Sequence, residues 1–258
     1  MSVPRFFTRD YFGQLCIGDS VEVQLAETDA HHAARVLRLS ADDMAEAVDP
    51  DGKVLLIRLS AAPVNSLCGF AVQIAEPRLW PRVALFQGMA KGDKTDLVVE
   101  KAVEIGVSVL VPVLFSRSVV TLDSQRRFAR GERLRRVALA AAKQSKRNFV
   151  PQVHDPVDFT SALALLAEYN AVLLAREGVD ALPGAGDALA STGPQSPSNV
   201  AVVVGPEGGF AREEVEALAG IGAVEFTLGD MVLRTETAGI VSVSLVLYSL
   251  GALGGRSK

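Results

Sequence analysis

The chain has 258 residues, of which 49% are hydrophobic and 22% are charged, and its net charge is -4. This composition excludes general disorder, and the length suits two modest domains. Cys16 and Cys68 are too few for a disulfide framework and lack the spacing of a metal motif, so we expect no metal. The charged residues within Met1–Asp10 do not fit a signal peptide, and no segment is apolar enough to span a membrane. We therefore expect a cytoplasmic protein.

The first 75 residues carry the pattern of a small β-rich domain. Short runs with a period of two lie at Ser20–Leu25, Lys53–Leu59 and Phe70–Ile74, with turn signals such as Asp51-Gly52 between them. Alternation of this kind predicts strands, and we expect them to form a barrel. A helix is predicted over residues 29–39, with Asp29 as its cap.

From residue 76 onward, strands alternate with helices. The strands are predicted at Val83–Phe86, Val107–Phe115, Ala171–Ala175, Val200–Val204 and Val224–Leu228. Helices are predicted at Thr95–Ile105, Arg133–Lys146, Ala211–Ala219 and Thr235–Leu250. This order indicates an α/β domain over residues 76–258, with a mostly parallel sheet and helices on both faces. Because Leu182–Ser198 is rich in Gly, Pro and Ser, we expect a long surface loop there.

One segment of this acidic chain is strongly basic. Between Gln125 and Val150 lie nine Lys or Arg residues against Glu132 alone, so the segment carries +8 while the whole chain carries -4. Such segregation of charge indicates phosphate binding. The alternative is a solvated helix face with no partner.

Two loops follow predicted strands and precede predicted helices. In Gly205-Pro206-Glu207-Gly208-Gly209-Phe210, the glycines allow backbone amides to approach a ligand, although a strand-to-helix turn also needs glycine for geometric reasons. No Lys-Ser or Lys-Thr follows these glycines, which excludes a P-loop.

The second loop runs from Leu228 into a helix that Thr235 is predicted to cap. Arg234 lies beside the positive amino end of that helix, so it needs an anionic partner. That partner is either a neighbouring carboxylate, such as Glu207 or Glu236, or a substrate.

Other short motifs lie in order along the chain. They are Val3-Pro4-Arg5-Phe6-Phe7, His32-Ala33-Ala34-Arg35-Val36-Leu37-Arg38, Lys91-Gly92-Asp93-Lys94, Lys101 to Val107, Arg117-Ser118, and Lys143-Gln144-Ser145 with Arg147. Together with the two loops, they resemble the landmarks of the 16S ribosomal RNA uridine N3-methyltransferases, which belong to the SPOUT superfamily. The resemblance implies a PUA-like RNA-binding barrel over residues 1–75, a trefoil-knotted methyltransferase domain over 76–258, and a homodimer acting on the small ribosomal subunit.

The resemblance also implies a cofactor, S-adenosylmethionine, and the residues around it. The cofactor-binding residues are expected to be Leu174, Ala175, Gly205, Pro206, Glu207, Gly208, Leu228, Gly229, Leu233, Arg234 and Thr235. The RNA-binding residues are expected to be Arg5, Arg9, Arg35, Arg38, Arg126, Arg127, Arg130, Lys146 and Arg147. The histidines His31 and His32 are expected to be structural, because no further ligand completes a metal site.

Arg234 is the predicted catalytic residue. Methylation at N3 requires the uracil ring to lose a weakly acidic proton, and a guanidinium can stabilise the resulting anion at a ring oxygen. Either Glu236 or water accepts the proton.

This chain has Asp230-Met231-Val232 where many relatives have Pro-Arg-Ile or Pro-Arg-Val. The competing hypotheses are a non-enzymatic RNA-binding factor for ribosome assembly and a SPOUT enzyme that acts on another RNA.

Overall fold

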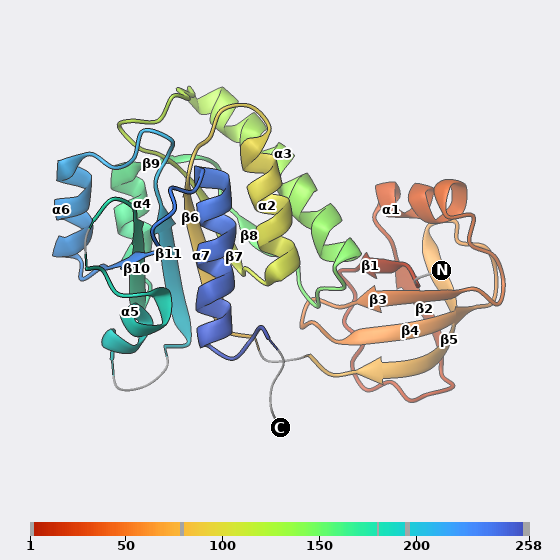
Figure 1. Ribbon diagram of the computed structural model, residues 1–258. Coiled ribbons are helices and arrows are strands. Elements are labelled where there is room, and N and C mark those ends of the chain that lie inside the picture. The colour runs from red at the N-terminus through yellow and green to blue at the C-terminus, as the bar shows by residue number, and fades with distance from the viewer. Residues whose placement is uncertain (1–2, 78–79, 180, 194–196, 255–258) are drawn as a thin grey trace. The chain divides into compact units, whose positions relative to one another are not determined.

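The computed structural model describes residues 3–77, 80–179, 181–193 and 197–254, and these form two compact units. The first unit contains Met1–Leu79 and Ala142–Val150, and the second contains Trp80–Ala141 and Pro151–Lys258. Figure 1 shows the helices and strands of each unit. The segment Ala142–Val150 thus packs with residues that are far from it in sequence.

The first unit is built on a five-stranded sheet with the order β1-β3-β4-β5-β2. β1 pairs with β3 in parallel, and the other pairs are antiparallel. Alternate side chains, among them Phe6, Leu55, Ile57 and Leu67, are buried together in one core, as the period of two predicts. The strands are β1 (Arg5–Phe7), β2 (Ser20–Gln24), β3 (Met44–Val48), β4 (Val54–Leu59) and β5 (Ser66–Ala75).

The helix in this unit differs from the prediction. It begins at Glu27 rather than Asp29, as α1 (Glu27–His31), and continues as a π-helical turn, η1 (His32–Val36). The N-cap is Ala26, and no side chain caps the helix. Asp29 is buried instead, and its carboxylate binds the ammonium of Lys143. The prediction that Asp29 caps this helix is therefore wrong, because the side chain serves a tertiary ion pair.

The segment Ala142–Val150 is fastened to the sheet by charged side chains. Arg5 donates to Glu46 Oε2 at 2.8 Å and to the carbonyl oxygens of Lys146 and Arg147 at 2.6 and 3.0 Å. Lys146 Nζ lies 2.7 Å from the same Glu46 oxygen. Burial raises the pKa of Glu46, but the hydrogen bonds and charges of Arg5 and Lys146 outweigh it and hold that pKa below its usual value.

The second unit contains a seven-stranded parallel sheet with the order β12-β10-β11-β6-β7-β8, and β9 also pairs with β7. The parallel sheet predicted over this part of the chain is confirmed. Its strands are β6 (Arg82–Gly88), β7 (Val109–Leu114), β8 (Gln152–Val153), β9 (Val157–Asp158), β10 (Ala171–Arg176), β11 (Asn199–Val204) and β12 (Val224–Thr227).

Helices cover both faces of this sheet, as predicted (Figure 1). Alternate residues of one strand serve opposite faces: Phe86 joins the core under α4 and α6, whereas Gln87 faces α7. α2, α5 and α7 lie on the second of these faces. The helices are α2 (Lys94–Ile105), α3 (Ser124–Gln144), α4 (Phe159–Leu166), α5 (Ala185–Ser191), α6 (Arg212–Gly220) and α7 (Thr235–Ser249).

Two boundaries in this unit correct the predictions. α3 begins at Ser124, well before the predicted start at Arg133. The prediction missed the first turns because they are too basic to show an apolar stripe. The predicted loop Leu182–Ser198 contains α5, whose buried residues Ala185, Ala188 and Leu189 are mostly small and give a weak hydrophobic signal. Residues 194–196 of that stretch lie outside the described residues.

Because the strands are parallel, the chain leaves β10, β11 and β12 at one common edge of the sheet. The segments that follow Ala175, Val204 and Thr227 are therefore neighbours in space. Within residues 3–77, 80–179, 181–193 and 197–254, no helix is long and apolar enough to cross a membrane. These residues also contain no cluster of three or more side chains suited to metal binding.

Candidate functional site

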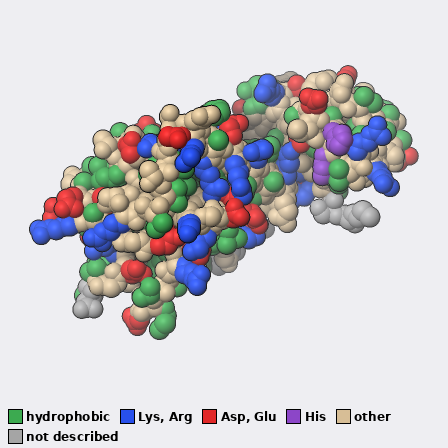
Figure 2. All heavy atoms as spheres, turned by 90° about the horizontal axis from the view of Figure 1, so that it is seen from above, with side chains coloured by type: hydrophobic (Ala, Val, Ile, Leu, Met, Phe, Trp, Pro, Cys, Tyr) green, Lys and Arg blue, Asp and Glu red, His purple; other side chains and the backbone are tan. Residues whose placement is uncertain are grey.

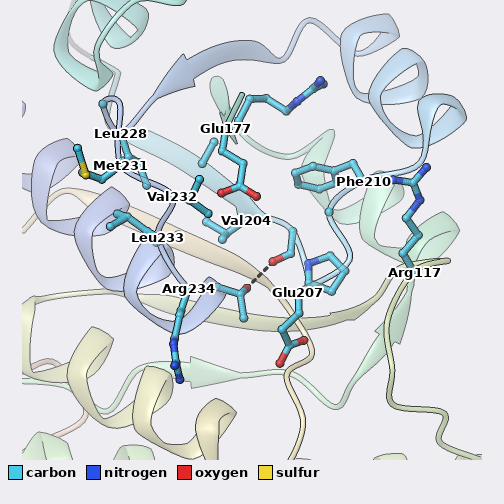
Figure 3. Close-up of a pocket in the computed structure, with 18 residues that line it drawn as sticks. Arg117, Glu177, Val204, Glu207, Phe210, Leu228, Met231, Val232, Leu233 and Arg234 are labelled. Atoms are coloured by element: carbon cyan, nitrogen blue, oxygen red, sulfur yellow. Dashed lines mark hydrogen bonds between the residues drawn. The ribbon is translucent and has the colours of Figure 1, made fainter. Parts of the chain in front are cut away.

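A cavity of about 470 Å³ lies at the edge of the sheet where β10, β11 and β12 end. Figure 3 shows its lining, which comes from the segments after these three strands and from the start of α7. Its volume falls in the range of small-molecule sites. The predicted cofactor residues that line it are Ala175, Gly205, Pro206, Glu207, Leu228, Gly229, Leu233, Arg234 and Thr235.

Two predicted cofactor residues lie outside the lining. Leu174 is 1% exposed and packs in the core beneath the cavity, since it points to the opposite face from its neighbours in β10. Gly208 packs against Arg117, where an added Cβ would lie 2.9 Å from the Arg117 carbonyl oxygen. Neither residue is part of the cavity surface.

The glycines at this edge allow two backbone segments to touch. A Cβ at Gly88, the last residue of β6, would lie 2.3 Å from Pro206 N and 2.5 Å from the Gly205 carbonyl carbon. A Cβ at Gly205 would meet the ring of Phe210 at 3.1 Å. The Gly205–Phe210 loop therefore needs glycine for packing as well as for access to its backbone.

Thr235 links this loop to α7. Its hydroxyl donates to the carbonyl oxygen of Gly205 and accepts a hydrogen bond from Gln87 Nε2 at 2.9 Å. The prediction that Thr235 caps α7 is wrong, because the N-cap is Arg234 and no side chain caps the helix. The Thr235 hydroxyl is instead the middle member of a buried chain from β6 to the loop.

We expect Thr235→Val to weaken the loop, because it removes the hydroxyl that donates to the Gly205 carbonyl and the shortest of the three hydrogen bonds that the Gln87 amide donates. Each buried group left unpaired costs about 1–3 kcal/mol. Thr235→Ser keeps both hydrogen bonds and serves as the control. Thermal unfolding and calorimetry with S-adenosylmethionine measure the effect. If the Val and Ser variants match in both measurements, the hydroxyl has no role in the loop.

Arg234 is exposed, and in the described part of the chain its guanidinium has no hydrogen bond or ion pair. Neither of the carboxylates considered from the sequence binds it. Glu207 and Glu236 lie 3.6 and 3.5 Å from the ammonium of Lys94 instead. In Figure 3 the guanidinium of Arg234 points away from the Gly205–Phe210 loop. The cation that the sequence singled out is therefore available to an anion from outside this chain.

Glu236 does not line the cavity. Its side chain is 12% exposed and faces Lys94, and its Oε2 atom is buried without a hydrogen-bond donor. By contrast, Glu177 follows β10 and extends its carboxylate toward the cavity (Figure 3). The cavity lining thus contains two acids, Glu207, which the sequence identified, and Glu177, which it did not.

Comparison with known proteins identifies the family of the chain. A family described as RNA methyltransferase domain matches residues 78–247. The ribosomal RNA small subunit methyltransferase E of Bacillus subtilis is 31% identical, over 88% of this chain and 90% of that protein. The chain belongs to the ribosomal RNA small subunit methyltransferase E family. The relative in Aquifex aeolicus is 29% identical, over 94% of this chain and 98% of that protein.

A solved structure agrees with this placement. The ribosomal RNA small subunit methyltransferase E from Neisseria gonorrhoeae, bound to S-adenosyl methionine, is 25% identical with a TM-score of 0.78. The match covers 96% of this chain and 98% of that one. A predicted RNA methyltransferase from Thermotoga maritima is 26% identical with a TM-score of 0.66, over 97% and 100% of the two chains.

In this member of the methyltransferase E family, the predicted RNA-binding residues of the first unit divide into two groups. Arg9, Arg35 and Arg38 are exposed and have no carboxylate partner among the described residues. Arg5 and Lys146 are bound to Glu46. The Arg147 guanidinium lies 4.3 Å from the Phe149 ring centroid, and burial lowers its pKa to about 10. Three of these six cations thus hold the unit together.

On α3, carboxylates from other segments neutralise most of the basic side chains. Arg126 lies 3.6 Å from Asp123, Arg127 lies 3.6 Å from Asp158, and Arg130 lies 2.9 Å from Asp96. Figure 2 shows Lys and Arg side chains interspersed with Asp and Glu on the face that it presents. The excess of +8 in the sequence window overstates the local charge, because the window omits carboxylates that are distant in sequence.

Sequence reasoning missed several residues of the cavity and its support. Arg117 lines the cavity and donates to the Gly208 carbonyl oxygen at 3.4 Å. It follows β7, so the strand-end rule could have found it. Gln87 and Lys94 act through tertiary hydrogen bonds and ion pairs, which leave no local signal in the sequence.

Proposed function

We propose that this protein transfers the methyl group of S-adenosylmethionine to N3 of a uridine in 16S ribosomal RNA of the small subunit. The observation that carries the proposal is an exposed Arg234 that has no anionic partner among the described residues, beside a cavity at the ends of β10, β11 and β12. The named function of the relatives supports the reaction class, and the landmark motifs favour uridine N3 over other positions.

The residues of the cavity suit this cofactor. Its lining combines apolar side chains, such as Leu228 and Phe210, with glycine backbone and the carboxylate of Glu177. Apolar walls fit an adenine ring, and a carboxylate fits ribose hydroxyls or an ammonium group. The cofactor supplies a methyl group activated by a sulfonium sulfur. The protein has to hold that methyl near the uracil ring and exclude water.

Arg234 is the residue that we propose for charge stabilisation. As the N3 proton leaves, negative charge develops on N3 and on the two carbonyl oxygens of uracil, and a guanidinium can donate hydrogen bonds to one of these oxygens. N3 then forms a bond to the methyl carbon as the carbon–sulfur bond breaks. Because Glu236 is held by Lys94 and lies outside the cavity, we assign the proton to water.

The finer architecture is also a proposal. We infer a PUA-like barrel over residues 1–75 and a trefoil-knotted SPOUT domain over 76–258. Barrel closure is supported by the Thr8 hydroxyl, which donates to the Gln24 carbonyl at 2.9 Å between the two edge strands. The knot is supported by the path of the chain, which leaves β12 at the sheet edge and enters α7, packed on β6 and α2.

We also propose that the protein is cytoplasmic and forms a homodimer. The cytoplasmic location follows from the proposed substrate, which is ribosomal RNA of the small subunit. α7 supports the dimer, because it is apolar on several faces and leaves Leu245 and Tyr248 39% and 65% exposed.

RNA binding should depend on the exposed arginines of the first unit. We expect Arg35→Glu with Arg38→Glu to weaken binding and to flatten its salt dependence by about 0.7–0.9 in slope per lost phosphate contact. Arg5→Ala is the comparison, because Arg5 is bound to Glu46 and should lower the melting temperature instead. Titrations at several salt concentrations measure the slope. An unchanged slope in the double variant would remove this surface from the RNA interface.

Calorimetry separates an enzyme from a non-enzymatic RNA-binding factor. We expect S-adenosylmethionine to bind the full chain, and labelled methyl groups to appear in 16S ribosomal RNA when small subunits are added. Heat of cofactor binding without transfer of methyl groups to ribosomal RNA would indicate a methyltransferase for another RNA. No heat at millimolar cofactor would indicate a binding module.

A further inference from the structure

Lys94, in the first turn of α2, joins two segments around the cavity. Its ammonium lies 3.6 Å from Glu207, in the Gly205–Phe210 loop, and 3.5 Å from Glu236, in the first turn of α7. The backbone amide of Lys91 also donates to Glu207, at 3.4 Å. Lys94 belongs to the Lys91-Gly92-Asp93-Lys94 motif, to which no role has yet been assigned.

Lys94 is free to bind these carboxylates because the two acids nearest to it in sequence already pair with arginines. Asp93 lies 2.8 Å from Arg133, and Asp96 lies 2.6 Å from Arg133 and 2.9 Å from Arg130. The arginines of α3 thus neutralise the two acids that are closest to Lys94 in sequence, the N-cap residue Asp93 and Asp96 of α2. Lys94 therefore pairs with acids on two other segments, the Gly205–Phe210 loop and α7.

The cluster of Lys94, Glu207 and Glu236 contains the two carboxylates that the sequence offered as partners for Arg234. Glu236 is two residues from Arg234, and Glu207 lies in the loop beside it, so both are candidate partners for its guanidinium. Arg234 nevertheless has no ion pair among the described residues. A guanidinium bound to a carboxylate would have to lose that partner before it could bind an anionic base.

We propose that Lys94 is a positioning residue for Arg234: it holds Glu207 and Glu236 and so keeps the guanidinium open to the substrate anion. The inference rests on the proposed function. Ion pairs of this partial exposure contribute little to stability, so the role of Lys94 lies in the choice of partners. Without Lys94, both carboxylates lose this partner, and the proposal requires that the Arg234 guanidinium turns to bind one of them.

Modification of arginine by phenylglyoxal, followed by peptide mass spectrometry, tests this without any methyl transfer. Arg234 should react readily in the unaltered chain and about tenfold more slowly in Lys94→Met, where a carboxylate holds its guanidinium. Lys94→Arg should keep the original reactivity. The triple variant Lys94→Met, Glu207→Gln, Glu236→Gln should restore it. Arg9, which is exposed in the other unit, is the internal reference.

Single-turnover methyl transfer provides the second readout. Lys94→Met should lower the rate about tenfold, and Lys94→Arg should keep it within about twofold, because charge rather than shape is needed. If Arg234 reacts equally in the unaltered chain and in Lys94→Met, the positioning role is wrong even when methyl transfer is observed. If the unaltered chain transfers no methyl group while the reactivity shifts as expected, the proposed function fails and the positioning role stands.

Discussion

Replacing Arg234 by alanine should lower the single-turnover rate of methyl transfer by about 10²–10³, the usual effect of losing one stabiliser of a developing anion. Cofactor affinity should change little, because the residue lies at the rim of the cavity and its guanidinium points away from the Gly205–Phe210 loop. Rapid-quench measurements with saturating cofactor and small subunits give the rate, and calorimetry gives the affinity.

Two further variants make the Arg234 result specific. Arg234→Lys keeps the charge but not the paired donors, so we expect a rate between those of the unaltered and Ala chains. Arg212→Ala is the matched control, since Arg212 is exposed on α6 and, among the described residues, its side chain pairs with Glu216 alone, at 2.7 Å. An Ala variant at 234 that reacts as fast as the control would contradict the assignment.

Gly88→Ala should reduce cofactor affinity more than any conservative change on the cavity surface. The added methyl would meet backbone atoms of Gly205 and Pro206 at 2.3–2.8 Å, and backbone cannot rotate away as a side chain can. Either β6 or the loop must move, and overpacking of this kind costs about 1–3 kcal/mol. We expect a lower melting temperature and a loss of affinity of at least about tenfold, measured by calorimetry on the folded variant.

Gly184→Ala is the control for that experiment. Gly184 lies in the same unit with a φ of -69°, and a Cβ there would have no neighbour within 4 Å. It should leave the affinity unchanged and lower the melting temperature only slightly, because Ala is a poorer N-cap residue than Gly. Equal affinities for the two variants would show that the contact between β6 and the loop does not shape the cavity.

The location of the cavity could be predicted from the sequence because it depends on local patterns. Buried apolar runs that end at Ala175, Val204 and Leu228 identify parallel strands, and parallel strands bring their following loops to one edge. The sequence also identified Arg234 as a cation in need of an anion, from its place at the start of a helix.

The partners of these residues could not be predicted, because ion pairs between distant segments leave no periodic signal. Lys94 binds Glu207 and Glu236, so of the two alternatives left open for Arg234, the ion pair with one of these carboxylates is not the one that the structure shows. The basic run on α3 is another example, since Asp96 and Asp158 neutralise part of it from other elements. Charge counted along a sequence therefore predicts a binding surface only after its tertiary partners are known.

Nucleoside mass spectrometry of ribosomal RNA from cells that lack this protein tests whether it methylates uridine N3. We expect 3-methyluridine to disappear from 16S ribosomal RNA while other modified nucleosides remain. The unaltered chain should restore it, and the Arg234→Ala chain should not. A normal level of 3-methyluridine in the deleted cells would show that another enzyme makes this modification.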